Sequence, residues 1–266
     1  MAKIRFTKME GLGNDYIYVD ATQYAIDNPA EVSRRLSDRH FGIGADGLVL
    51  IGRPQNADFS MRMFNADGSE GKMCGNASRC IGKYVYDKGL TDKTELTLDT
   101  LSGIKHLSIH LGADGNAESV TVDMGAPVKV APGCTAEACG RVFTGVYVDV
   151  GNPHLVIRTE DAEAVPVDVW GPAIERLPQF PGGVNVEFFS VTAPGCIRMR
   201  VWERGSGITM ACGTGACATA AAAMALGLVS GRCTILMDGG PLQIENNGTL
   251  LMTGPATTVF EGETEL

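Results

Sequence analysis

The sequence predicts a mixed α/β protein built from two similar halves. The expected order of elements, strands, helix, strands, helix, strands, occurs in the first half of the chain and again in the second. Equivalent residues also keep one spacing, because Cys74 and Cys212 are 138 positions apart, as are Asn14 and Asn152. Two copies imply a pseudo-two-fold arrangement in which equivalent loops face each other across a cleft.

Length and composition limit the class of protein. At roughly 150 residues per domain, 266 residues suggest about two domains. Apolar residues make up 44% and charged residues 20%, which excludes a disordered chain. The 22 basic and 31 acidic residues give a net charge of -9. Because no basic run occurs, we expect neither nucleic acid nor a membrane as partner.

Two segments of the sequence indicate whether the protein is secreted or crosses a membrane. The first ten residues carry four charges, so no secretory signal is visible and we expect a cytoplasmic protein. The stretch between Arg204 and Arg232 has no charge and is long enough to cross a bilayer. It consists mainly of small residues, without flanking Trp or Tyr, which predicts a buried helix instead.

In the first half, short runs bounded by Gly, Asn or Asp predict strands. Asn28 before Pro29 predicts the start of a helix that reaches about Arg39. A second helix is expected from about Gly75 to Asp87, with Gly89 as its stop. The expected strands are Ile4–Met9, Tyr16–Asp20, Leu48–Ile51, Phe59–Phe64, Thr94–Leu98, Ile104–Ile109 and Ser119–Asp123.

The second half is expected to repeat this order after a linker near Gly125–Gly140, which carries two prolines and no clear period. A short helix fits Val167–Leu177, and a long helix is expected from about Gly213 to Val229. Further strands finish the chain. The expected strands before them are Gly145–Val150, Leu155–Arg158, Val184–Ser190 and Ile197–Trp202.

Eight cysteines without a secretion signal predict free thiols in a reducing compartment. No C-x-x-C pair occurs and the four histidines do not cluster, which argues against zinc. Cys74 and Cys212 stand out because each precedes Gly at the expected start of a helix. Unpaired N–H groups there can bind a ligand carboxylate and should lower the pKa of a thiol.

Two such thiols, with a carboxylate held between two helix ends, suit inversion of a stereocentre. One thiolate removes a proton from the carbon beside the carboxylate, and the opposite thiol protonates the other face. Helix dipoles and a dry cleft would stabilise the carbanion. No phosphate cradle or lysine motif marks a pyridoxal phosphate site, so no cofactor is expected.

The residues around these turns resemble the diaminopimelate epimerase family of cofactor-independent isomerases, which serve lysine and cell-wall precursor synthesis. The resemblance spans the chain. It is carried by MEGLGNDY (Met9–Tyr16), FNADGSEGKMCGNASRC (Phe64–Cys80), GNPH (Gly151–His154), GGVNVEF (Gly182–Phe188) and WERGSGITMACGTGACA (Trp202–Ala218).

The resemblance implies two α/β halves, each a barrel or wrap of strands around a long helix, with the active site in the cleft between them. The last strands would return to the first half. The domains are therefore expected at residues 1–120 plus about 252–266, and at residues 121–251. A cytoplasmic homodimer acting on a small amino acid substrate is implied.

The resemblance also assigns roles. Cys74 and Cys212 correspond to the paired acid and base. The backbone carboxylate cradle corresponds to Gly75, Asn76, Gly213 and Thr214. Side chains that bind substrate, including its distal end, correspond to Asn14, Asn65, Asn152, Asn185 and Arg204. Glu203 lies beside the reacting amino group, and His154 supports activity.

Some positions depart from the family pattern. Members often have His at the position of Glu10, Phe at Tyr16 and Gly at Ala77. Gly47 stands where some members use a Gln that contacts substrate, so no such side-chain contact is implied here. Phe260 replaces a tyrosine that some members use at the dimer contact.

Three other functions remain open from the residues. A proline racemase or hydroxyproline epimerase shares the fold and paired cysteines, but usually has His where this chain has Asn76. A thiol redox protein could pair two facing cysteines, although redox pairs are usually C-x-x-C. An amino-acid-binding protein would need no chemistry, and loss of one cysteine would favour it.

Overall fold

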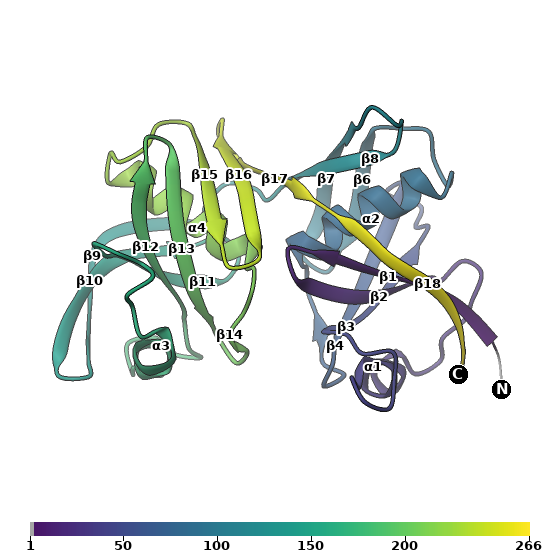
Figure 1. Ribbon diagram of the computed structural model, residues 1–266, viewed down its shortest axis with the longest axis horizontal. Coiled ribbons are helices and arrows are strands. Elements are labelled where there is room, and N and C mark those ends of the chain that lie inside the picture. The colour runs from purple at the N-terminus through teal and green to yellow at the C-terminus, as the bar shows by residue number, and fades with distance from the viewer. Residues whose placement is uncertain (1–2) are drawn as a thin grey trace. The chain divides into compact units, whose positions relative to one another are not determined.

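The computed structural model describes residues 3–266, which fold into two units. One contains the chain up to Val122 together with Gly254–Leu266, and the other contains Asp123–Thr253. Each unit combines strands with two helices, as Figure 1 shows. The mixed α/β class predicted from the sequence is confirmed.

The first unit is a sheet whose strands follow the order β18-β1-β2-β3-β4-β6-β7-β8. β2 and β3 run parallel, as do β4 and β6, and the other neighbours run antiparallel. The short β5 pairs with the end of β4. The bounds are β1 Lys3–Gly11, β2 Asn14–Asp20, β3 Gly47–Gly52, β4 Phe59–Asn65, β5 Glu70–Gly71, β6 Glu95–Thr100, β7 Gly103–Leu111, β8 Ala117–Asp123 and β18 Thr257–Glu265.

The second unit has the corresponding order β9-β10-β11-β12-β13-β15-β16-β17. Its parallel pairs are β11 with β12 and β13 with β15, at the same places in the order. The short β14 pairs with the end of β13. The bounds are β9 Lys129–Ala138, β10 Arg141–Asp149, β11 Pro153–Arg158, β12 Asn185–Ala193, β13 Cys196–Glu203, β14 Gly207–Ile208, β15 Arg232–Met237, β16 Gly240–Asn246 and β17 Leu250–Pro255.

Each unit has one outer helix and one central helix. The outer helices α1 (Pro29–Ser37) and α3 (Val167–Glu175) pack on neighbouring strands, α1 on β3 and β4. The central helices are α2 (Gly75–Asp87) and α4 (Gly213–Ala225). Strands β9 to β13, β15 and β16 all contact α4, so this Ala-rich helix forms the middle of its unit. A helix that is apolar on all sides requires such a wrap.

The 138-residue repeat is visible in the structure. The strands β1 and β10, the helices α1 and α3, and the helices α2 and α4 begin and end 138 positions apart. Gly13 precedes Asn14 and Gly151 precedes Asn152, and both glycines have positive φ, 83° and 104°. Left-handed backbone at both places explains why glycine recurs there.

Two local predictions were wrong. The stretch Gly125–Gly140, expected as a linker, contains the strand β9. Its Pro132 and Gly133 lie at a β-bulge of this edge strand, where proline is tolerated. The long helix ends at Ala225, four residues before Val229. Backbone bonds from Leu226, Gly227 and Leu228 close its last turn, and Gly227 has a φ of 68°.

The uncharged stretch between Arg204 and Arg232 contains α4, and its prediction as a buried helix is confirmed. Within residues 3–266, no helix has the length and apolar content needed to cross a membrane.

Candidate functional site

Cys74 and Cys212 occupy the same position in their units. Each is the N-cap of the central helix and has extended backbone, with φ, ψ of -135°, 121° and -125°, 107°. Each sulfur accepts an N–H bond from the third helical residue, at 3.5 Å from Ala77 and 3.3 Å from Gly215. Each cysteine follows a short hairpin, β4–β5 or β13–β14. Hairpin and helix together fix where the thiol lies.

In the first unit, the amide of Asn14 lies beside Cys74. The Cys74 thiol donates to Asn14 Oδ1 at 3.6 Å, and Asn76 Nδ2 donates to the same oxygen at 3.4 Å. The Nδ2 of Asn14 donates to Asp46 Oδ2 at 2.8 Å. Burial raises the pKa of Asp46, and the charge of Asp15 raises it further. Asp46 thus holds the Asn14 amide with its oxygen toward Cys74.

A buried arginine lies in α2, below the first cysteine. Arg79 is 0% exposed and donates to Asn76 Oδ1 at 3.0 Å and to the Pro255 carbonyl at 3.1 Å. Burial lowers the pKa of its guanidinium, and the nearby Cys80 and Cys74 oppose that shift. Burial raises the pKa of Cys80 to about 12, so this second thiol of the helix stays protonated.

Two further first-unit positions lie at the end of the β3–β4 hairpin. Asn65 ends β4, and its Nδ2 donates to Ser69 Oγ at 3.0 Å. Gly47 pairs with it from β3. A Cβ at position 47 would lie 2.0 Å from the Phe64 carbonyl oxygen and 2.8 Å from Cε1 of Tyr16. The backbone therefore leaves no room for a side chain at position 47.

In the second unit, a chain of hydrogen bonds leads to Cys212. Its sulfur lies 3.5 Å from Oγ1 of Thr214, which accepts from Asn152 Nδ2 at 3.3 Å. Asn152 Oδ1 lies 3.1 Å from Nε2 of His154. The other ring nitrogen of His154 lies 2.6 Å from Glu187 Oε1, and both of these side chains are fully buried. Equivalent loops thus hold different groups in the two units.

Burial and two nearby carboxylates disfavour ionisation of Cys212. Burial raises the pKa of this thiol well above its ordinary value, and the charges of Glu203 and Glu187 raise it further. Bonds from Thr214 and from the Gly215 N–H act in the opposite direction. The expectation that a helix end lowers the thiol pKa is therefore wrong for Cys212, because burial and negative charge outweigh the helix end.

Glu203 ends β13 beside this thiol. Burial raises the pKa of its carboxyl, whereas hydrogen bonds from Thr209 and Cys212 lower it. The charge of Glu187 also raises it. Glu203 is therefore able to exchange a proton with groups around Cys212 nearer to neutral pH than an ordinary glutamate.

Asn185 and Arg204 are bonded to each other and to nearby backbone. The N–H of Arg204 donates to Asn185 Oδ1 at 2.9 Å, and Asn185 Nδ2 donates to the Pro153 carbonyl at 2.8 Å. The exposed guanidinium of Arg204 donates to the Gly182 carbonyl at 3.2 Å. Asn185 thus fixes the backbone that carries Arg204.

The sequence did not predict three of these groups. They are Asp46, Arg79 and Glu187. Two carried a signal in their spacing, because Glu187 follows Asn185 by two positions in a strand and Arg79 follows Asn76 by three in a helix, which places each pair on one face. Asp46 precedes Gly47 in a loop, where spacing indicates no face.

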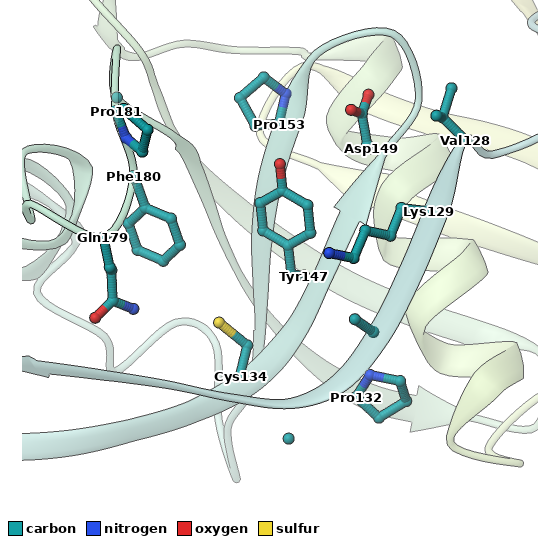
Figure 2. Close-up of a pocket in the computed structure, with 13 residues that line it drawn as sticks. Val128, Lys129, Pro132, Cys134, Tyr147, Asp149, Pro153, Gln179, Phe180 and Pro181 are labelled. Atoms are coloured by element: carbon teal, nitrogen blue, oxygen red, sulfur yellow. The ribbon is translucent and has the colours of Figure 1, made fainter.

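A pocket of about 740 Å³ opens elsewhere on the second unit. Figure 2 shows the ring of Tyr147 beside that of Phe180, and the two stack with centroids 6.4 Å apart. The Lys129 ammonium points toward the Tyr147 ring, 5.5 Å from its centroid. Pro153 links the pocket to the loop of Asn152. Among residues 3–266, no group of three His, Cys, Asp or Glu is placed to hold a metal ion.

Comparisons with known proteins concern nearly the whole chain. The sequence profile described as diaminopimelate epimerase matches residues 6–130 and 146–259. A diaminopimelate epimerase of Parabacteroides distasonis is 56% identical, covering 97% of both chains. One from Methanococcus maripaludis is 49% identical over 99% of this chain and 100% of its own.

Solved structures share the fold at low identity. A phenazine biosynthesis protein of the PhzF family from Bacillus anthracis superimposes with a TM-score of 0.77 at 16% identity, covering 100% of both chains. A hydroxyproline epimerase from Agrobacterium vitis, solved with bound trans-4-hydroxy-L-proline, gives 0.72 at 18% identity, covering 98% of this chain and 92% of its own. These likenesses establish the fold alone.

Proposed function

The chain belongs to the diaminopimelate epimerase family of isomerases, and on that premise we propose that it interconverts L,L- and meso-diaminopimelate with Cys74 and Cys212 as acid and base. The observation that carries the proposal is the matched position of the two thiols, each at the N-cap of a central helix. Lysine biosynthesis in the cytoplasm is the setting that this activity implies.

The proposed chemistry needs no cofactor. One thiolate takes the α-proton, which leaves a carbanion, and the other thiol donates its proton to the opposite face. The two cysteines thereby exchange protonation states in each turnover. Backbone N–H groups of Gly75, Asn76, Gly213 and Thr214 bind the α-carboxylate, where helix dipoles stabilise the charge that develops.

The remaining side chains divide between two tasks. Glu203 and His154 lie around Cys212 and adjust its ionisation, and Glu203 also binds the reacting amino group. The other side chains bind the substrate, including its distal, non-reacting end, and they are Asn14, Asn65, Asn152, Asn185 and Arg204. All of these except Asn14 together offer more polar contacts than one small amino acid could use.

We also propose a homodimer with Phe260 at its contact. This residue lies in β18, where its ring is 46% exposed and meets Phe6 edge-on at 5.9 Å. The neighbouring Val259 is 54% exposed. Because consecutive residues of a strand point to opposite faces, the assigned contact rests on Phe260 and not on a patch of both residues. Sedimentation of Phe260→Asp should show a shift toward monomer, and an unchanged dimer would contradict the assignment.

Deuterium labelling tests the two-base mechanism. Purified protein without added pyridoxal phosphate or metal is incubated in D₂O with L,L-diaminopimelate. Early meso product should carry deuterium, because the opposite thiol delivers deuterium from solvent. The remaining substrate should stay unlabelled, because the thiol that removes the α-proton exchanges it with solvent only after release of the bound molecule. Early label in both pools at equal levels would contradict two bases.

The control substrate in that experiment is L-proline, which separates this function from that of the racemases with a similar fold. A site built to bind a distal group rejects analogues that lack it, often by about 10⁴-fold. Comparable turnover of L-proline would favour the racemase alternative, and turnover that required added pyridoxal phosphate would exclude the proposed chemistry.

A further inference from the structure

Two equivalent asparagines present opposite ends of their amides to the cysteines. Asn14 and Asn152 are 138 positions apart. Asn14 gives its Nδ2 to Asp46 at 2.8 Å and turns its oxygen to the Cys74 thiol. Asn152 turns its oxygen to His154 at 3.1 Å and its Nδ2 to Thr214 at 3.3 Å. The acceptor Asp46 orients the amide of Asn14, and a ring N–H of His154 orients the amide of Asn152.

The surroundings of His154 explain the second orientation. Nε2 faces the amide oxygen of Asn152 at 3.1 Å, and because an amide oxygen only accepts, Nε2 carries the proton of that hydrogen bond. The other ring nitrogen, Nδ1, is joined to Glu187 Oε1 at 2.6 Å. Both side chains are fully buried, so this second hydrogen bond fixes the ring with Nε2 directed at Asn152.

The orientation of the Asn152 amide sets the direction of the next hydrogen bonds toward Cys212. Because His154 Nε2–H donates to the Asn152 oxygen, the Asn152 nitrogen must donate to Oγ1 of Thr214. That hydroxyl then has its own proton left for Cys212 Sγ, 3.5 Å away. Because the Cys212 thiol gives its own proton to Glu203, Thr214 Oγ1–H is the donor and Cys212 Sγ the acceptor in this inferred hydrogen bond.

We propose that Asp46 and the His154–Glu187 pair are positioning groups that turn the two asparagines in opposite directions, so that Cys74 donates a hydrogen bond to Asn14 while Cys212 receives one from Thr214. The proposal rests on the proposed function only for the role of the two sulfurs. The direction of each hydrogen bond is measurable in protein that shows no epimerase activity.

The consequence differs for the two thiols. A hydrogen bond received from Thr214 favours the thiolate of Cys212. It acts against the charges that face the sulfur, Glu203 from β13 and Glu187 from β12, and against the hydrogen bond that Cys212 gives to Glu203. His154, from β11, is connected to the sulfur through Asn152 and Thr214. At Cys74 the oxygen acceptor favours the protonated thiol.

Imidazole ¹⁵N spectra of the wild-type protein test the first link. His154 is assigned by comparison with His154→Gln. We expect a protonated Nε2 in the wild type, and a changed Nε2 signal in Glu187→Gln, because that variant alters the hydrogen bond that fixes the ring. A bare Nε2 in the wild type would overturn the proposal, as would an Nε2 signal that Glu187→Gln leaves unchanged.

Alkylation of Cys212 tests the last link. Its pH dependence is followed with iodoacetamide, and tandem mass spectrometry separates Cys212 from Cys217. Thr214→Val should raise the midpoint by about one pH unit, whereas Thr214→Ser should stay near the wild type. An unchanged or lowered midpoint in Thr214→Val, or a serine variant that behaves like valine, would overturn the proposal.

Asp46→Asn is the matched experiment in the first unit. The isosteric amide can donate to Asn14 Oδ1, so the Asn14 amide turns and presents Nδ2 to Cys74. We expect Cys74 alkylation at pH 7.5 to rise several-fold, measured on the tryptic peptide Met73–Arg79. An unchanged or slower rate would overturn the role given to Asp46.

Discussion

The turn at Cys74 and the turn at Cys212 share a backbone but differ in charge. Beneath Cys74 lies the buried guanidinium of Arg79, which favours a thiolate, whereas Cys212 faces the carboxylates of Glu203 and Glu187, which favour a thiol. The repeat places Asn65 where the second unit has Glu203, and Cys217 where the first has Arg79. The units therefore kept their geometry and changed their electrostatics.

The proposed hydrogen-bond directions oppose the charges in both units. At each sulfur, one influence favours the thiolate and another the thiol. An acid/base group that must give a proton in one direction of the reaction and take it in the other works best when the two states are close in free energy. Different charges and hydrogen bonds around Cys74 and Cys212 can therefore support the same acid/base role.

Removal of either thiol should have the largest effect. Each direction of the reaction needs both an acid and a base, so Cys74→Ala and Cys212→Ala should each reduce kcat/KM for epimerisation by about 10³-fold or more. Initial rates by optical rotation over a range of L,L-diaminopimelate concentrations, including ones below KM, measure the loss. Near-full activity in Cys212→Ala would break the comparison by showing that one unit suffices.

The second-largest effect should be the difference in alkylation rate between Cys74 and Cys212. Cys212 is 4% exposed and its pKa is raised well above the ordinary value, whereas Cys74 is partly exposed. At pH 7.5 we expect iodoacetamide to modify Cys74 at least about 10-fold faster, because only the thiolate reacts. Equal rates would mean that the carboxylates do not control Cys212.

Gly215 and its equivalent Ala77 offer a paired exchange at the third helical position. A Cβ on Gly215 would lie 2.8 Å from Glu187 Oε1 and 3.2 Å from Cys212 Sγ. Gly215→Ala should therefore lower kcat about 10-fold, although alanine is the better helix former. Ala77→Gly should mainly cost about 1 kcal/mol of unfolding free energy. Chemical denaturation with kinetics measures both, and equal losses of kcat would contradict this account.

The smallest effect concerns one carboxylate. Glu203 raises the pKa of Cys212, so Glu203→Gln should lower the pH midpoint of Cys212 alkylation and speed the reaction roughly 3- to 10-fold at pH 7.5. Epimerisation should fall in the same variant. The matched Asn65→Gln in the first unit changes no charge and should leave the Cys212 midpoint in place. A higher midpoint in Glu203→Gln would contradict the sign.

The sequence predicted elements that have local signals at both ends. The helix Gly75–Asp87 was predicted with its observed bounds, since a cysteine turn starts it and a glycine follows it. The end of α4 was missed although Gly227 gives the same stop signal as Gly89, because apolar residues continue past it to Val229. β9 was missed because Pro132 and Gly133 look like a linker, although an edge strand accepts them.

The site was predicted as far as the motifs reach. Both cysteines and the asparagines were found from the repeat and from the resemblance. Asp46 and Glu187 were missed because their role depends on which side chain each one meets in the folded unit, Asn14 for one and His154 for the other. The alternation in β12 places Glu187 on one face with Asn185 but does not indicate His154 as its partner, and for Asp46 in its loop spacing indicates no face.

The strand β18 has a consequence for the order in which the protein can fold on the ribosome. It covers the edge of β1, with Lys3 paired to Glu265, so the two strands are far apart in the sequence. In the second unit β9 covers β10 and is synthesised immediately before it. The second unit can therefore cover this edge as soon as β10 is made, whereas in the first unit the edge of β1 stays open until β18 has been synthesised.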